Sequence, residues 1–248
     1  MTDFDLSLVQ RYHRQTILPN FGIEGQQKLA SSKVLVVGAG GLGSATLPYL
    51  AAGGVGTIGV IDFDQVSESN LHRQVIHTPE FLQQAKTISA KAYLNKLNPK
   101  VKVITFEEEL TIQNAEKIVK DFDLVIDGSD NFETKYLVND VCAKLNIPDV
   151  WAALNQFDGR VSVFDAKRGP CYRCLFPEPP PIGSVPSCAE AGVLGSLCGV
   201  IGNLQGLEAI KLLVGLGESL IGRLMIFDAL NAEWETISIQ QDPLCEKH

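Results

Sequence analysis

Residues 33–43, KVLVVGAGGLG, decide the fold of this chain. The segment begins with an apolar, β-branched run typical of a buried strand. Gly38, Gly40 and Gly43 follow with the spacing G-x-G-x-x-G. Glycine at these positions permits a tight turn, lets a phosphate approach the backbone, and allows close packing of the next helix on the strand. Because the first N–H groups of that helix favour an anion, we predict a strand, a phosphate-binding turn and a helix.

Strand-like and helix-like segments alternate through the first half of the chain. Short β-branched runs predict strands, and segments with apolar side chains at helical spacing predict helices between them. This alternation is typical of a parallel sheet with right-handed crossovers. The further predicted strands are 57–64, 101–110 and 123–131, and the predicted helices include 88–98 and 111–122.

The pattern changes after about residue 150. Residues 159–165 and 223–240 alternate in a way that predicts antiparallel strands, with a turn at Asn231. No repeat or linker separates the two halves. We therefore predict one α/β domain over 1–248 with a Rossmann-like sheet. Its nucleotide-binding half, 1–150, is parallel, and the half over 151–248 adds antiparallel strands.

A long apolar helix is predicted at about residues 191–215. Gly195, Gly199, Gly202 and Gly206 lie on one face of it, since their 4-3-4 spacing follows the helical period. Small residues there let another backbone approach closely. Core packing within the subunit and a dimer interface are both open interpretations of this face.

Composition and charge restrict the partners of the protein. The formal net charge of −8 argues against broad binding to nucleic acid or to an anionic membrane. The N-terminus lacks the basic start and apolar run of a signal peptide. The uncharged residues 191–207 fall short of the about 20 needed for a membrane span. We expect a cytoplasmic protein, in which the 6 cysteines are thiols or metal ligands rather than disulfides.

The residues after the glycine turn bear on which nucleotide binds. Asp62 ends the next predicted strand, where a carboxylate can accept a hydrogen bond from a ribose hydroxyl. The turn and Asp62 alone favour NAD or FAD. Asn70, Arg73 and Lys86 follow, however, and a triphosphate with an incoming carboxylate needs more positive charge than a dinucleotide. Asp130, after the fourth strand, can hold Mg²⁺ through one carboxylate, so the set favours a nucleoside triphosphate.

The order of the motifs resembles that of the MoeB/ThiF family, the bacterial relatives of the ubiquitin-activating enzymes. The resemblance covers residues 11–245. Members of the family adenylate the C-terminal Gly-Gly carboxylate of a ubiquitin-like sulfur carrier such as MoaD or ThiS, for molybdopterin or thiamin sulfur transfer. The motifs, in chain order, are RYHRQ, GAGGLG, D-x-D-x-V-x-x-SNLHRQ, Lys86, GSDN, CYRC and SCAEAGVLG.

The resemblance implies roles for individual residues. Arg14 corresponds to an arginine that reaches the phosphates from the partner subunit of a homodimer, Asp62 lies at the ribose, and Asp130 binds Mg²⁺. QQAK at 83–86 departs from the family, whose members usually have Gly and Pro before the lysine. The remaining residues that the resemblance places at ATP are Gly38, Gly40, Gly41, Gly43, Asp64, Asn70, Arg73, Lys86 and Asn131.

The expected chemistry needs no general base. A terminal carboxylate has a pKa of about 3.3–3.7 and is already ionised near neutral pH. The main barrier is the approach of one anion to another, so Arg14, Arg73 and Lys86 with Mg²⁺ on Asp130 are the expected catalysts. His72 and His77 match no catalytic arrangement, and we assign them surface or capping roles.

Cysteines near the C-terminus predict a metal site. Cys171 and Cys174 have zinc-ligand spacing, and Cys245 and His248 repeat that spacing. Four nitrogen or sulfur ligands close a tetrahedral structural zinc site. The resembling family has Cys-x-x-Cys in both places, so His248 is a departure. A redox pair is the alternative for Cys171 and Cys174.

Cys188 lies in a proline-broken loop just before the long helix, where a helix N-terminus lowers the pKa of a thiol. In some members of the resembling family the matching cysteine bonds covalently to the carrier, and others adenylate without it. A covalent sulfur-transfer role for Cys188 is therefore a hypothesis. No rhodanese-like segment follows residue 248, so we expect a separate sulfur-donor protein. Cys142 and Cys198 are predicted core residues.

Three other functions remain open from the sequence. An NAD-dependent oxidoreductase would need a hydride-transfer acid or base and would not need Arg14, Lys86 or Asp130. A member of the family that adenylates a small molecule or a tRNA base is a second alternative, and a degenerate scaffold is a third. The main prediction is a homodimeric, zinc-containing enzyme that uses ATP and Mg²⁺ to adenylate a sulfur carrier.

Overall fold

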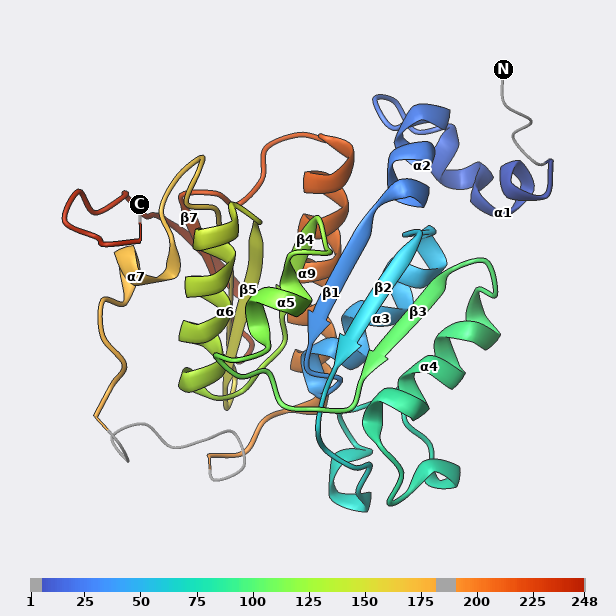
Figure 1. The fold of residues 1–248 in the computed structure, drawn as a ribbon, viewed down its shortest axis with the longest axis horizontal. Helices are drawn as coiled ribbons and strands as arrows, with labels where there is room; N and C mark the ends of the chain where they lie inside the picture. The colour runs from blue at the N-terminus through green and yellow to red at the C-terminus, as the bar shows by residue number, and fades with distance from the viewer. Residues whose placement is uncertain (1–5, 182–190, 248) are drawn as a thin grey trace.

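A mixed sheet of eight strands runs through the protein (Figure 1). The computed structural model describes residues 6–181 and 191–247. The strands are β1 (Lys33–Val37), β2 (Thr57–Ile61), β3 (Lys102–Phe106), β4 (Leu124–Asp127), β5 (Asp149–Asn155), β6 (Asp158–Phe164), β7 (Arg223–Asp228) and β8 (Glu233–Ser238).

The strand order is β3-β2-β1-β4-β5-β6-β7-β8. Neighbours from β3 through β5 are parallel, and β6, β7 and β8 pair antiparallel. This confirms the predicted Rossmann-like sheet with antiparallel strands added by the C-terminal half. The chain reverses its direction of travel across the sheet between β1 and β4, and ligands of open α/β sheets bind at that switch point, outside the carboxyl ends of the strands.

Helices cover both faces of the sheet (Figure 1). The helices are α1 (Leu6–Thr16), α2 (Gly22–Ser31), α3 (Gly41–Gly53), α4 (Lys86–Leu97), α5 (Ala115–Val119), α6 (Phe132–Leu145), α7 (Tyr172–Leu175) and α9 (Gly195–Val214), with short 3-10 turns η1 (Glu68–Asn70) and η2 (Pro79–Phe81). Side chains of β1 alternate between the faces: Val34 and Val36 join the core under α3, α4 and α9, whereas Leu35 and Val37 join the core under α5 and α6.

The helix predicted over 111–122 is shorter than its apolar pattern suggests. Only Ala115–Val119 is α-helical. The Asn114 side chain accepts from the backbone N–H of Thr111 at 2.7 Å and donates to the carbonyl of Glu109 at 2.9 Å. Such local side-chain bonds offer the backbone an alternative to helix. Residues 111–114, the first turn of the predicted helix, therefore form a loop.

The glycine face of α9 packs inside the subunit. A Cβ atom added at Gly202 would lie 2.5 Å from the carbonyl oxygen of Leu42 on α3, and one at Gly195 would lie 2.4 Å from that of His72. The hydroxyl of Thr46 donates to the carbonyl of Gly202 at 2.7 Å. Core packing therefore accounts for Gly195 and Gly202, whereas Gly199 lies against no other described segment and the dimer interface stays an open interpretation there.

Among the described residues, α9 is the one helix long and apolar enough to cross a membrane, by length and composition only. Half of its most apolar window is buried inside the fold. Contacts with α3, α2 and the strands β4, β5 and β6 cover it. This packing explains its apolar composition.

Two glycines of α9 offer a matched test of that packing. We expect Gly202→Ala to lower the free energy of unfolding by about 1–3 kcal/mol, because its Cβ collides with the α3 backbone. At Gly199 no atom of the described residues lies within 4 Å of an added Cβ, so Gly199→Ala should raise stability by roughly 0.5–1 kcal/mol. Urea denaturation of the two variants measures both, and equal effects would contradict this packing.

Candidate active site

The glycine turn joins β1 to α3 at the carboxyl end of the sheet. Gly38 has a φ of 91°, which glycine adopts at little cost. A Cβ at Gly43 would lie 2.0 Å from the carbonyl oxygen of Gly38, and one at Gly38 would lie 3.0 Å from that of Gly128. The turn is therefore tightly closed and lies directly against the turn that follows β4.

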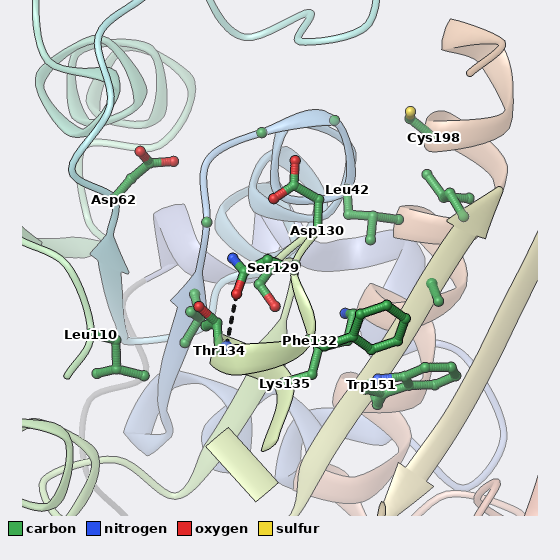
Figure 2. Close-up of a pocket in the computed structure, with 18 of the residues that line it drawn as sticks. Leu42, Asp62, Leu110, Ser129, Asp130, Phe132, Thr134, Lys135, Trp151 and Cys198 are labelled. Carbon is green, nitrogen blue, oxygen red and sulfur yellow. Dashed lines mark hydrogen bonds between the residues drawn. The ribbon is translucent and has the colours of Figure 1, made fainter. Parts of the chain in front are cut away.

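A cavity of about 760 Å³ opens at this junction (Figure 2). Ligand pockets are typically about 300–1,000 Å³, so the space suits a nucleotide together with a second reactant. Asp62 and the glycine turn border it on one side, and Phe132 and Trp151 lie on the other. The predicted nucleotide residues that line it are Gly38, Gly40, Gly41, Asp62, Asp64, Arg73, Lys86, Asp130 and Asn131.

Some predicted site residues lie elsewhere. Gly43 packs behind the turn, and Asn70 lies behind Arg73, whose guanidinium donates to the Asn70 side-chain oxygen at 2.9 Å. Arg14 is exposed on α1. Its neighbour Gln15 donates to the carbonyl of Gly53 at the far end of α3, so in one chain Arg14 lies away from the cavity. Its role as a partner-subunit residue stays a prediction.

Cys188 and His248 lie outside the described residues. Their predicted roles as a covalent site and a zinc ligand are therefore not addressed by the geometry. Cys198, predicted to be a core residue, is buried but also lines the cavity beside Gly41.

Asp62 faces the glycine turn. One carboxylate oxygen accepts from the backbone N–H of Ala39 at 2.7 Å and the other from that of Asp64 at 2.8 Å. Burial raises the pKa of Asp62 above its usual value, and Lys86 opposes that shift. The backbone bonds fix the carboxylate at the edge of the cavity, where a ribose hydroxyl can still reach a remaining lone pair.

Lys86 begins α4 with its ammonium group paired to Asp64. The Nζ–Oδ2 distance is 2.7 Å, and the Lys86 side chain is 5% exposed, against 52% for Asp64. Before α4, Gln83 has a φ of 64°, a left-handed conformation that favours glycine. The QQAK loop thus delivers Lys86 to the cavity with Gln83 held in a conformation that is strained for a residue other than glycine.

Asp130 and Asn131 lie in the turn after β4. Figure 2 shows the Asp130 carboxylate between the glycine turn and the aromatic side of the cavity. The Asn131 side chain caps α6 by accepting from the N–H of Thr134 at 2.8 Å. Mg²⁺ typically binds one or two carboxylates plus waters and phosphate oxygens, so the exposed Asp130 carboxylate beside the phosphate-binding turn fits that ion.

The aromatic wall of the cavity was not predicted from the sequence. Tyr136, Trp151, Tyr172 and Phe176 lie against one another, with ring centroids of Trp151 and Tyr172 5.5 Å apart. All four line the cavity, as do the cations Lys135 and Arg160. Trp151 lies in the apolar run 150–154 of β5, the strand that pairs with β4, and this run was the available signal in the sequence.

His77 is not a surface residue, so its predicted surface or capping role was wrong. It is 4% exposed. Its Nε2 lies 2.9 Å from the carbonyl oxygen of Ala39, and its Nδ1 lies 2.9 Å from the hydroxyl of Ser89 on α4. Since a carbonyl only accepts, Nε2 carries the proton and donates. His77 thus ties the glycine turn to the helix that begins with Lys86.

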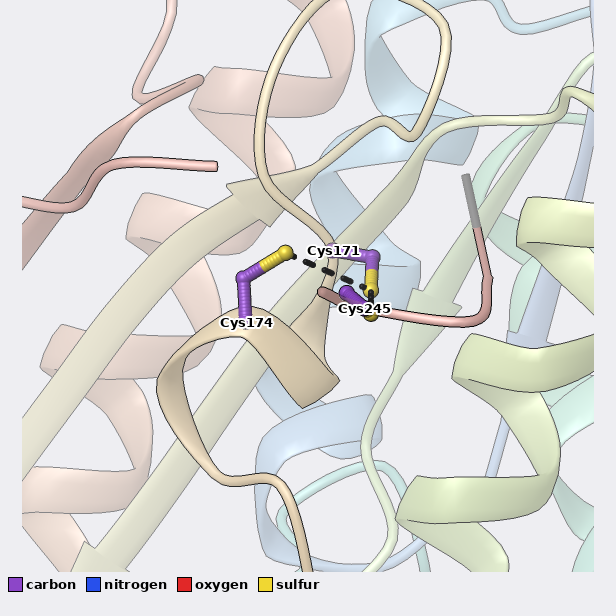
Figure 3. A group of neighbouring side chains, drawn as sticks. All are labelled: Cys171, Cys174 and Cys245. Carbon is purple, nitrogen blue, oxygen red and sulfur yellow. Dashed lines mark hydrogen bonds between the residues drawn. The ribbon is translucent and has the colours of Figure 1, made fainter. Parts of the chain in front are cut away.

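Three cysteines, Cys171 and Cys174 at α7 and Cys245 near the C-terminus, lie close together (Figure 3). Cys171 Sγ lies 3.8 Å from that of Cys174 and 3.6 Å from that of Cys245, and all three lie within 4.8 Å of one another. Burial raises the pKa of the Cys171 thiol to about 12. An ion pair of 3.1 Å between Lys247 and Asp140 on α6 holds the C-terminal segment in place.

These sulfur positions suit a tetrahedral ion. With Zn–S bonds of about 2.3 Å, the edge of a regular tetrahedron is about 3.8 Å, close to both distances above. A fourth donor would complete the set.

The fold and cavity define an α/β nucleotide-binding protein whose site sits at the switch point of a doubly wound sheet. Comparison with known families gives the particular family: the model of the ThiF family matches residues 12–247. The chain belongs to the ThiF family, which confirms the resemblance drawn from its motifs.

Relatives in the family are named as adenylyltransferases. The chain is 50% identical over 242 residues to the sulfur carrier protein adenylyltransferase of Thermus thermophilus, covering 96% of this chain and 89% of that protein. It is 50% identical to the probable adenylyltransferase/sulfurtransferase MoeZ of Mycobacterium tuberculosis, and 47% identical to MOCS3 of Drosophila willistoni. These two matches cover 96% and 94% of this chain. They cover only 62% of MoeZ and 51% of MOCS3, so the chain spans just over half the length of those relatives.

Solved structures support the fold. E. coli MccB with AMPCPP and MccA superimposes with a TM-score of 0.85 at 23% identity, covering 95% of this chain and 73% of that one. E. coli MccB with MccA-N7isoASN gives 0.83 at 22% identity, covering 99% and 76%.

The stability of the protein should depend on pH through His77. Burial lowers the pKa of His77 below its usual value of about 6.5. As pH falls below about 6.5 the unfolded chain takes up a proton that the folded protein resists, so the contribution of His77 is full above that pH and is lost below it. We expect His77→Gln to cost about 1–3 kcal/mol near neutral pH, and less in acid, by urea denaturation.

His13, exposed on α1, provides the control. His13→Gln should leave stability unchanged at both pH values. A penalty for His77→Gln that stays constant across the pH range would contradict the assignment of a neutral, buried His77.

Proposed function

We propose that this protein adenylates the C-terminal Gly-Gly carboxylate of a ubiquitin-like sulfur carrier, with ATP as the adenylyl donor. One observation carries the proposal. A cavity at the switch point brings Asp130, Arg73 and Lys86 to the glycine turn, in a chain 50% identical to a sulfur carrier protein adenylyltransferase.

Different groups on the two sides of the switch point bind the phosphates, the ribose and the metal ion. The glycine turn and the N-terminus of α3 offer backbone N–H groups to the phosphates, and Asp62 accepts from the ribose. Arg73 and Lys86 stand on the same side and neutralise phosphate charge. Lys86 reaches them by exchanging its bond to Asp64 for one to a phosphate oxygen.

Asp130 is the residue that would hold Mg²⁺. When bound there, Mg²⁺ supplies positive charge to the phosphate oxygens of ATP. The single carboxylate leaves the other coordination positions to water and phosphate, as this ion prefers.

The reaction is a displacement at the α-phosphorus. A carboxylate oxygen of the carrier forms the new bond to phosphorus, and the bond to the β-phosphate oxygen breaks and releases pyrophosphate. The carboxylate arrives ionised, so no proton moves in this step. Trp151 and the aromatic residues around it exclude water from the cavity, which protects the acyl-adenylate from hydrolysis.

The enzyme is expected to depend on a second copy of itself and on a sulfur donor. The enzyme acts as a homodimer in which Arg14 of each chain reaches the phosphates in the other. A separate protein donates the sulfur, and Cys188 is the candidate covalent site. The reaction takes place in the cytoplasm.

ATP–pyrophosphate exchange tests the proposed function. With Mg²⁺ and MoaD- or ThiS-type carriers, we expect exchange that requires the intact Gly-Gly tail and is lost when two residues are removed. Asp130→Ala should reduce the exchange rate at least about a hundredfold, because it removes the metal-binding carboxylate. Asp121→Ala, at an exposed carboxylate outside the cavity, should not.

Absence of exchange with every carrier, in protein that binds ATP, would overturn the carrier as substrate. Bound NAD on the purified protein would instead indicate an NAD-dependent oxidoreductase that transfers hydride.

We also propose that Cys171, Cys174 and Cys245 bind a structural Zn²⁺, with His248 as fourth ligand. The separation of the sulfur atoms supports it. When bound, the ion would fasten the C-terminal segment to α7. This anchors the strand β8 and the far side of the cavity wall through Tyr172.

Metal analysis tests the zinc site. We expect about one zinc per chain, lost in Cys174→Ser with a melting temperature lower by roughly 5–10 °C. Cys142→Ala, at a buried cysteine of α6 outside the cluster, should keep its zinc whatever its stability. His248→Ala should bind zinc more weakly. Wild-type protein that stays free of zinc after purification from zinc-supplemented medium would contradict this assignment.

A further inference from the structure

A buried lysine lies beneath the turn that carries Asp130. Lys135, on α6, is 5% exposed. Its ammonium group donates to the carbonyl oxygen of Ala152 on β5 at 2.8 Å and to the Asp127 carboxylate at the end of β4 at 3.3 Å. It also lies 5.4 Å from the ring centroid of Trp151. Lys135 thus links β4, which precedes the Asp130 turn, to its neighbour β5.

The Asp127 carboxylate holds the next turn of the chain. Its Oδ1 accepts from the backbone N–H of Ser129 at 2.9 Å and from the Ser129 hydroxyl at 2.5 Å, while Oδ2 receives Lys135. Gln205 on α9 donates to the Asp127 carbonyl at 2.8 Å. Every one of these bonds is buried, and Ser129 is the residue before Asp130.

Lys135 is the cation that accompanies the buried carboxyl groups of this cluster. Asp127 is fully buried, and a second buried carboxyl, Asp149, lies nearby. Burial, together with Asp127, raises the pKa of Asp149 well above its usual range. Lys135, whose Nζ lies 3.3 Å from Asp127 Oδ2, is the cation paired with the Asp127 carboxylate. A buried charge without its partner is strongly unfavourable, so loss of Lys135 would loosen the hold of Asp127 on the turn at Ser129.

We propose that Lys135 is a positioning residue for adenylyl transfer, because through Asp127 and Ser129 it fixes the turn that presents Asp130. The inference rests on the proposed function in one respect only: it takes Asp130 as the Mg²⁺ ligand. Nothing in it requires Lys135 to touch the nucleotide.

This role predicts a specific defect. The glycine turn, Asp62 and Lys86 stand on the other side of the cavity, so binding of ATP without metal should be unaffected by Lys135→Met. The extra affinity that Mg²⁺ gives to ATP binding should fall about tenfold, and kcat for exchange should fall more than KM for ATP changes. Lys135→Arg keeps the charge and the donors, and should recover much of both.

Calorimetric titration of ATP, with Mg²⁺ and with EDTA, provides a readout independent of turnover. The matched control is Lys144→Met on the same helix, since Lys144 is exposed and pairs at 2.5 Å with exposed Glu116. Ser129→Ala serves as a second variant, because it removes one of the two bonds to Asp127 Oδ1 while leaving Lys135 in place. It should show a weaker form of the same defect, even where Lys135→Met does not fold.

The outcomes separate the two proposals. Lys135→Met or Ser129→Ala that equals Lys144→Met in the effect of Mg²⁺ on ATP binding would overturn the positioning role. Equal losses with Mg²⁺ and with EDTA would also overturn it, since they indicate general structural damage. If wild-type protein binds Mg²⁺ and ATP but exchanges with no carrier, the proposed function fails and the titrations still decide the role of Lys135.

Discussion

The close contact of two backbone turns is the constraint on which the rest of the structure depends. Gly38, after β1, approaches Gly128, after β4, so closely that an added Cβ at Gly38 would lie 3.0 Å from the Gly128 carbonyl oxygen. That contact is possible because the chain reverses direction across the sheet between these strands. It puts a phosphate-binding turn and an acidic turn on the two sides of one cavity. Reacting groups held in fixed proximity avoid much of the entropic cost of meeting.

Most of the fold followed from local patterns. The glycine spacing and the β-branched runs predicted the parallel strands β1 to β4, and alternation around Asn231 predicted the antiparallel strands, because both are properties of neighbouring residues. The parallel strand β5 was not predicted. The late start of α5 was missed because the side chain of Asn114 competes with the helix for backbone bonds. The packing of the α9 glycines was left open because it depends on α3, more than 140 residues away in the chain.

The site residues also differ in whether their roles follow from local sequence or from contacts between distant segments. Residues that follow strand ends, such as Asp62 and Asp130, were predictable because position along the strand fixes where their side chains lie. Lys135, Trp151 and His77 were missed or wrongly assigned, since their roles come from contacts between elements that no spacing reveals. Arg14 cannot be placed at the cavity within one chain, so its predicted role depends on an assembly that one chain does not contain.

Three cations of the site are already engaged before any ligand arrives. Lys86 is paired with Asp64, Arg73 is bonded to Asn70, and Lys135 is bonded to Asp127. Buried or half-buried cations require such partners, since desolvation is costly. The partners differ in burial, however: Asp64 is half exposed, whereas Asp127 is fully buried. Water can solvate Asp64 when phosphate replaces it at Lys86, but nothing can replace Asp127 at Lys135. The Lys86–Asp64 pair is therefore suited to partner exchange when phosphate binds. The Lys135–Asp127 pair is suited to holding the turn after β4 in place while the ligand binds.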